Sequence, residues 1–373
     1  MTDLKDPTDR VTQLQGFLQA DPENVALRMD LAETALQANC PEIALEALQQ
    51  WPIDQESGNA AMTLKGLCLL KLKSYAEAVD CFEQALTVEP ENTALRFNLA
   101  WSQAMLGQKA TALNLLDEAT TSALPQAAML HIQLLHEAGD LEGGWQRSEG
   151  YLEQHPNDPG LNAAISVLAL DLEKTDVAMS CAERSNGHPD ALATLGTLAL
   201  DADNIAEAEK LFTHAVQVNQ TRPRAWIGLG LSDLINGQYT DATKRIDYGA
   251  SLFETHIGSW IAAGWAYLLS GDHATARARF EKALSLDRNF SESHGSLAVI
   301  EAMEGNTRAA KDLSKRAFKL DKSCFSAAFA SSLILSSQGQ EKKAQRIFDQ
   351  AINSSIGDNG KTVAQSLSRL GLT

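Results

Sequence analysis

The sequence predicts an all-α fold, a right-handed superhelical solenoid of stacked antiparallel helix pairs, on three observations. First, 373 residues are too many for one ordinary hydrophobic core unless the chain is repetitive. Second, a small residue, mostly alanine, recurs with a period close to 34 residues. Third, a glycine often stands five residues before it, and apolar residues follow helical spacing on both sides.

The recurring small residue defines ten repeats. Its successive spacings are 34, 34, 32, 34, 30, 34, 34, 34 and 34 residues. The ten positions are Ala44, Ala78, Ala112, Gly144, Ala178, Ala208, Ala242, Ala276, Ala310 and Ala344. A fixed period of this length is typical of repeat architectures, in which each unit is one supersecondary motif.

Each repeat is expected to form two helices joined by a tight turn, because glycine at the turn ends the first helix. The turn glycines are Gly107, Gly139, Gly237, Gly271, Gly305 and Gly339. A small residue such as Gly66, Gly196 or Gly264 stands twelve residues before the anchor and lets the two helices approach closely. One helix pair alone could not bury its apolar faces, so neighbouring repeats must stack.

The segment (Y)-x-x-A-x-x-x-F-x-x-A around each anchor resembles the tetratricopeptide repeat family, over residues of about 24 to 352. Four divisions are expected: a partial repeat or cap over 1–22, an acidic lobe of repeats 1–5 over 23–186, a second lobe of repeats 6–10 over 187–352, and a C-terminal capping helix and tail over 353–373. The capping helix itself is expected over Lys361–Leu370. Between the lobes, Ser185–Pro189 shortens the period to 30 and is interpreted either as a hinge or as an irregular turn.

The resemblance implies that the first helix of each repeat lines a concave groove, where ligands of the family lie. Two positions four residues apart on these helices are largely apolar, although lining positions of the family are usually polar. The predicted partner-binding groove consists of Met29, Leu67, Phe97, Trp101, Met105, Met129, Val167, Ile227, Leu231, Ile261, Trp265, Val299, Met303, Phe329 and Leu333. The alternative is that tight superhelical winding or a second subunit hides this stripe as core.

Charge is distributed unevenly along the chain. The net charge of -17 lies entirely within residues 1–186, while residues 187–373 hold 20 acidic and 20 basic residues. An acidic chain with a pI near 4.9 is a poor general binder of nucleic acid. A possible basic ridge runs along the second helix of repeat nine, with Arg277 and Arg279 of repeat eight beside it; a solvated face is the alternative. The ridge consists of Arg308, Lys311, Lys315, Lys319 and Lys322.

No residue pattern indicates catalysis, a cofactor or a metal site. The five cysteines form no C-x-x-C pair, and the nearest histidines, His131 and His136, are five residues apart rather than three or four. The longest apolar run, about ten residues near Trp260, is too short to span a bilayer. We therefore expect no metal, no membrane span and a reducing, cytoplasmic location.

The predicted function is non-enzymatic: a scaffold or chaperone-like adaptor that holds an apolar helix or extended segment of a protein or peptide partner in the groove. Two alternatives remain, a regulatory receptor for a small peptide or lipid-like ligand, and a regulatory subunit of an enzyme complex. Self-association between the acidic lobe and the basic ridge is also possible.

Overall fold

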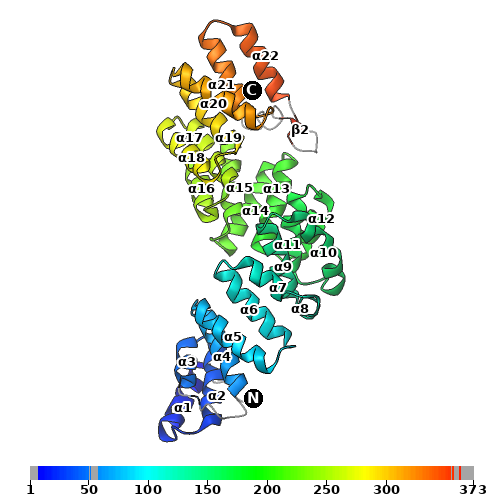
Figure 1. Ribbon diagram of the computed structural model, residues 1–373, viewed down its shortest axis with the longest axis vertical. Coiled ribbons are helices and arrows are strands. Elements are labelled where there is room, and N and C mark those ends of the chain that lie inside the picture. Colours follow the sequence, from blue (N-terminus) through cyan, green and yellow to red (C-terminus); the bar gives the residue numbers. More distant parts are fainter. Residues whose placement is uncertain (1–6, 50, 52–57, 354, 357–360, 363–373) are drawn as a thin grey trace. The chain divides into compact units, whose positions relative to one another are not determined.

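Helix pairs follow one another along both parts of the chain in the computed structural model (Figure 1). The structure describes residues 7–49, 51, 58–353, 355–356 and 361–362. The chain divides into two units, one ending at Leu168 and the other beginning at Ala169. This division falls within the fifth repeat, while a lobe boundary at residue 186 remains a prediction.

The first unit contains a single helix and then the helix pairs of repeats one to four. Its helices are α1 (Pro7–Ala20), α2 (Val25–Gln37), α3 (Pro41–Leu48), α4 (Gly58–Lys71), α5 (Tyr75–Val88), α6 (Thr93–Met105), α7 (Lys109–Leu115), α8 (Glu118–Ala123), α9 (Pro125–Glu137) and α10 (Leu141–Gln154). Helix α1 packs against α2, as the second helix of a preceding repeat would. In repeat three the second helix is broken in two, because Asp117 caps a new helix by accepting a hydrogen bond from the Thr120 amide at 2.8 Å.

Helix α11 (Pro159–Asp171) is the first helix of repeat five and contains the division between the units. The second unit continues with α12 (Thr175–Arg184), α13 (Pro189–Asp201), α14 (Ile205–Val218), α15 (Pro223–Ile235), α16 (Tyr239–Phe253), α17 (Ile257–Leu269), α18 (His273–Leu286), α19 (Ser291–Met303), α20 (Thr307–Leu320), α21 (Phe325–Ser337) and α22 (Glu341–Ile352). Within this unit α13 packs against α15 and α19 against α21, so first helices of neighbouring repeats contact one another.

The turn inside every repeat uses a left-handed backbone conformation at the residue five before the anchor. Six of these residues are the predicted glycines, with φ between 72° and 86°. The other four are Asn39, Lys73, Glu173 and Asp203, with φ near 60°. Left-handed backbone is unfavourable for residues with a Cβ, so stacking of the helices imposes the same turn even where the sequence lacks glycine.

Small and aromatic residues interlock within repeats two, six and eight. Phe82, Phe212 and Phe280 are fully buried four residues after the anchor. A Cβ on Gly66 would lie 2.6 Å from the Phe82 ring, and one on Gly196 would lie 2.7 Å from the Phe212 ring. The glycine twelve residues before the anchor therefore makes the space that the ring fills.

A recurring hydrogen bond fixes the start of the first helix in six repeats. A side chain sixteen residues before the anchor bonds to the carbonyl oxygen six residues before itself, although the residue type differs between repeats. The pairs are Arg28 with Pro22, Arg96 with Pro90, Asn162 with Pro156, Trp226 with Gln220, Trp260 with Glu254 and His294 with Arg288. These bonds satisfy loop carbonyls that would otherwise lack a partner among the described residues.

Two short segments near the C-terminus depart from the expected helix. Strand β1 (Ser355–Ile356) pairs antiparallel with β2 (Lys361–Thr362). The capping helix expected from Lys361 therefore does not begin at that residue, because the backbone there pairs with β1. Residues 363–370, the rest of that expected helix, lie outside the described residues.

Candidate functional site

An apolar cavity lies between the first helices of three successive repeats in the second unit. Its volume is about 220 Å³, and it is lined by residues of α13, α15 and α17, with contributions from α14, the end of α16 and the α16–α17 turn. The apolar lining includes Leu200, Phe212, Ile227, Leu231, Phe253 and Ala262. Ile227 and Leu231 belong to the groove predicted from the sequence, so the structure places these two candidates in one cavity.

The fully buried Phe212 ring lines the cavity, and its position depends on glycines in both flanking first helices. Gly196 of α13 and Gly228 of α15 each leave space that a Cβ would take from the ring. A glycine in a helix interior lowers helix propensity, and here the close approach of an aromatic ring accounts for it.

The polar groups at the cavity are already partnered. Arg224 donates two hydrogen bonds to the Asp171 carboxylate, from Nη1 to Oδ1 at 3.2 Å and from Nη2 to Oδ2 at 2.6 Å. Such a bidentate pair neutralises the guanidinium and fixes its orientation. His256 Nδ1 lies 2.6 Å from Ser259 Oγ. The cavity is therefore suited to an apolar side chain rather than to a charged group.

Several side chains of the predicted stripe pack against the protein's own core in repeats eight to ten. The Trp265 ring centroid lies 6.0 Å from that of Phe280 and 6.3 Å from that of Phe329. Val299 lies in the same cluster at 0% exposure, with Leu333 packed against it. Val299 was expected in the groove; this is wrong for the structure described here, because aromatic side chains from α17 and α21 pack against its cluster and exclude solvent.

Candidates in the first unit are mostly half-buried and pack against cores of their own and neighbouring repeats. Met29, Leu67, Phe97 and Trp101 contact such clusters, and the Phe97 and Trp101 rings lie 6.2 Å apart. The remaining candidates with partial exposure are Met129, Val167 and Ile261. Met105 and Met303 stand apart, with 44% and 47% of their surfaces exposed at the ends of α6 and α19.

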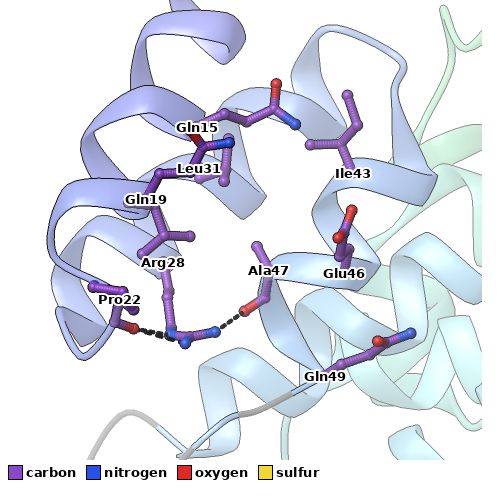
Figure 2. A pocket seen from close by; sticks show the side chains of 10 residues that line it. Gln15, Gln19, Pro22, Arg28, Leu31, Ile43, Glu46, Ala47 and Gln49 are labelled. Carbon is purple, nitrogen blue, oxygen red and sulfur yellow. Dashed lines mark hydrogen bonds between the residues drawn. The ribbon is translucent and has the colours of Figure 1, made fainter.

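A pocket of mixed polar and apolar lining lies between α1, α2 and α3 and was not expected from the sequence (Figure 2). Its volume is about 320 Å³, and Gln15, Gln19, Glu46 and Gln49 line it together with Arg28. The Arg28 guanidinium donates to the carbonyl oxygens of Pro22 and Ala47 at 2.7 and 3.3 Å. Because Arg28 ties the α1–α2 turn to α3, it has a structural role in this pocket.

The predicted basic ridge is exposed on α20 and the turn after it. Its expected extension into repeat eight is wrong for two arginines. Arg277 forms ion pairs with Glu301 and Glu304 at 2.6 and 2.8 Å, and Arg279 pairs with Asp247. These arginines join neighbouring repeats and are not available as an unpaired positive surface.

The part of the chain that the structure describes contains neither a group of metal ligands nor a membrane-spanning helix. Among these residues, no three His, Cys, Asp or Glu side chains are grouped as a metal ion would require. None of the described helices combines the length and the apolar character needed to cross a bilayer.

Comparison with known families identifies the repeat. Models described as tetratricopeptide repeat match residues 60–92, 193–244 and 257–290. The matches fall in both units and coincide with helix pairs of the structure. The class defined by fold and repeat is the helical solenoid, and the chain is a tetratricopeptide-repeat protein.

Comparison with solved structures gives matches of low sequence identity. A chain in the crystal structure of the APC/C hetero-tetramer Cut9-Hcn1 has a TM-score of 0.54 at 15% identity, covering 94% of this chain and 85% of that one. MamA has a TM-score of 0.35 at 14% identity, covering 42% and 92%. YrrB, described as a TPR protein with an unusual peptide-binding site, has a TM-score of 0.36 at 16% identity, covering 47% and 91%. A search of curated proteins gave no match.

Proposed function

We propose that the chain is a protein-binding scaffold or adaptor that holds an apolar segment of a partner protein against the first helices of repeats six to eight. The observation that carries the proposal is the apolar cavity around Ile227 and Leu231. Tetratricopeptide repeats serve in general as protein-interaction modules, which supports this class of function.

The size and chemistry of the cavity define the segment. A volume of about 220 Å³ accommodates one large aliphatic or aromatic side chain but not a whole ligand of drug size. Neighbouring first helices then provide the surface along which the rest of an amphipathic helix or extended peptide would lie. Because Arg224 is neutralised by Asp171, we expect an uncharged anchor residue in the partner. A cytoplasmic location remains part of this proposal.

The test is affinity purification from the native organism with a point variant in the cavity. Leu231→Lys places an ammonium group in the apolar lining and should release the partner that the wild-type chain captures. Leu320→Lys, at an exposed position of α20, is the matched control and should retain it. Circular dichroism establishes that both variants are folded. Capture that is equal for both variants would place the partner outside the cavity; extraction of a small molecule instead of a second chain would favour a small-ligand receptor.

A further inference from the structure

A second cavity, with basic residues at its rim, lies between α20 and α21. Its volume is about 420 Å³, and it is lined by Lys311, Ser314, Lys315, Phe318, Lys319 and Ser331. The lysines stand at four-residue intervals, so they share one face of α20. All three are exposed, and none forms an ion pair with any residue that the structure describes.

Ser314, one of the residues that line this basic cavity, has an unsatisfied hydroxyl donor. Ser314 is only 4% exposed, and its hydroxyl has no hydrogen-bond partner among the described residues. Ser148 occupies the same place in repeat four, and there the hydroxyl donates to the Gly144 carbonyl at 3.0 Å. A buried hydroxyl without a partner is unfavourable, so an acceptor supplied from outside would stabilise Ser314.

The position of Ser314 within the repeat also accounts for the volume of the basic cavity. In repeats two, six and eight this position holds the buried phenylalanines Phe82, Phe212 and Phe280. Serine lacks the volume of a phenyl ring, which leaves room beside Phe318 at the junction of α20 and α21. The basic cavity therefore combines a small residue, at a position that holds phenylalanine in other repeats, with a row of ammonium groups.

The charges around the cavity are predominantly positive. Helix α20 carries five basic residues and one carboxylate, Asp312. Asp321, directly after the helix, accepts hydrogen bonds from the amide and hydroxyl of Ser323 and is engaged in that turn. An anionic ligand would thus meet a favourable field and little competition from carboxylates of the same helix.

We propose that this face binds an acidic segment of a partner protein, with carboxylates on alternate residues of an extended chain. Lysines four apart on a helix rise by about 6 Å, and alternate residues of a strand lie about 6.6 Å apart, so each ammonium group can meet one carboxylate. The Ser314 hydroxyl donates to an oxygen of one carboxylate, and Phe318 and the lysine stems contact the apolar atoms of the peptide. The site is independent of the apolar cavity in repeats six to eight.

The experiment measures fluorescence anisotropy of labelled peptides with the full chain. The probes are Gly-Glu-Leu-Glu-Leu-Glu-Gly, the same peptide with Gln for each Glu, and the Gln peptide with one phosphoserine. The Glu peptide should bind at least about tenfold more tightly than the Gln peptide, and its affinity should fall as salt shortens the Debye length. Lys311→Glu/Lys315→Glu should weaken binding at least about tenfold, and Ser314→Ala about two- to tenfold.

The matched control is Lys342→Glu/Lys343→Glu, which makes the same change of net charge at exposed positions of α22. It should leave the affinity for the Glu peptide within about twofold, because these lysines do not line the cavity. Carbodiimide cross-linking, which joins carboxylates to amines directly, should attach the Glu peptide to Lys311, Lys315 or Lys319. The proposal would be overturned if the Gln peptide bound as tightly as the Glu peptide, or if both double variants lost the same affinity. It would also be overturned if only the phosphopeptide bound, or if the chain self-associated without binding peptide.

Discussion

Phe212 of α14 packs against Gly228 of α15, the first helix of the next repeat, so closely that a Cβ on Gly228 would overlap the Phe212 ring. The contact joins repeats six and seven, and Phe212 also lines the apolar cavity. One glycine thus sets both the stacking of two repeats and the floor of the candidate binding site.

Gly228→Ala is expected to destabilise the second unit by about 1 to 3 kcal/mol, because the added methyl group overpacks a fully buried ring. Urea unfolding followed by circular dichroism measures the change. Gly16→Ala is the control, since a Cβ there would meet nothing within 4 Å, and it should be neutral or slightly stabilising. Equal stability of the two variants would show that α15 adjusts freely and does not fix the cavity.

Lys73→Gly is expected to stabilise the first unit by about 0.5 to 1 kcal/mol. Lys73 has φ of 60° in the turn of repeat two, a conformation that costs residues with a Cβ but not glycine. The reverse change, Gly271→Ala at φ of 86° in repeat eight, should destabilise by about 1 to 2 kcal/mol. Thermal unfolding of both variants tests these two predictions. A loss of stability in Lys73→Gly would contradict the claim that the backbone at Lys73 is strained.

The buried His131 is expected to make stability fall in mild acid. Burial lowers the pKa of His131 from 6.5 to about 4, and its Nδ1 lies 2.7 Å from the Tyr151 hydroxyl. The unfolded imidazole takes up a proton near pH 6.5 but the folded one only near pH 4. The neutral His131 therefore makes its full contribution to the free energy of unfolding above pH 6.5. This contribution is lost as the pH falls from 6.5 to 4, by at most about 1.4 kcal/mol per pH unit.

Urea unfolding at about pH 7 and about pH 5 measures this dependence. His131→Gln removes the titrating group and should flatten it relative to wild type. His214→Gln, at an exposed histidine of α14, should keep the wild-type slope. An unchanged slope in His131→Gln would assign the acid sensitivity to carboxylates instead.

Arg245→Met should destabilise the seventh repeat, because Asp233 is 1% exposed and Arg245 Nη1 donates to its Oδ1 at 2.8 Å. Burial already raises the pKa of Asp233, and removal of the guanidinium leaves the carboxylate without its cation. The expected loss is about 1 to 3 kcal/mol at neutral pH. The double variant Arg245→Met/Asp233→Leu should regain most of it in urea unfolding, since both partners are then apolar. A double variant less stable than the single one would show that the pair is indispensable.

Local spacing in the sequence was sufficient to predict the repeats. The ten anchor positions are all buried, because a residue without a long side chain is required wherever two helices of a repeat meet. The six glycine turns were predictable for the same reason. The left-handed turns at Lys73 and Glu173 were not, because stacking imposes them against the preference of the residue itself.

The candidate groove was predictable only in part. Its apolar positions could be read from each helix separately, but their exposure depends on contacts between repeats. Trp265 and Phe329 meet across the cluster that contains Val299, and no pattern within a single repeat encodes that contact. At Ile227 and Leu231, where the apolar cavity lies, the side chains remain partly exposed.

The most direct test of the central proposal fills the apolar cavity without changing its polarity. Ala262→Phe adds a phenyl ring at a lining position, and Ala274→Phe adds the same ring at an exposed position of α18. Calorimetric titration with the apolar segment of the captured partner, as a synthetic peptide, gives the Kd of each variant. We predict that Ala262→Phe weakens binding by at least about tenfold, or 1.4 kcal/mol, while Ala274→Phe binds as wild type does. Unchanged affinity in Ala262→Phe would contradict the proposal that this cavity receives the partner.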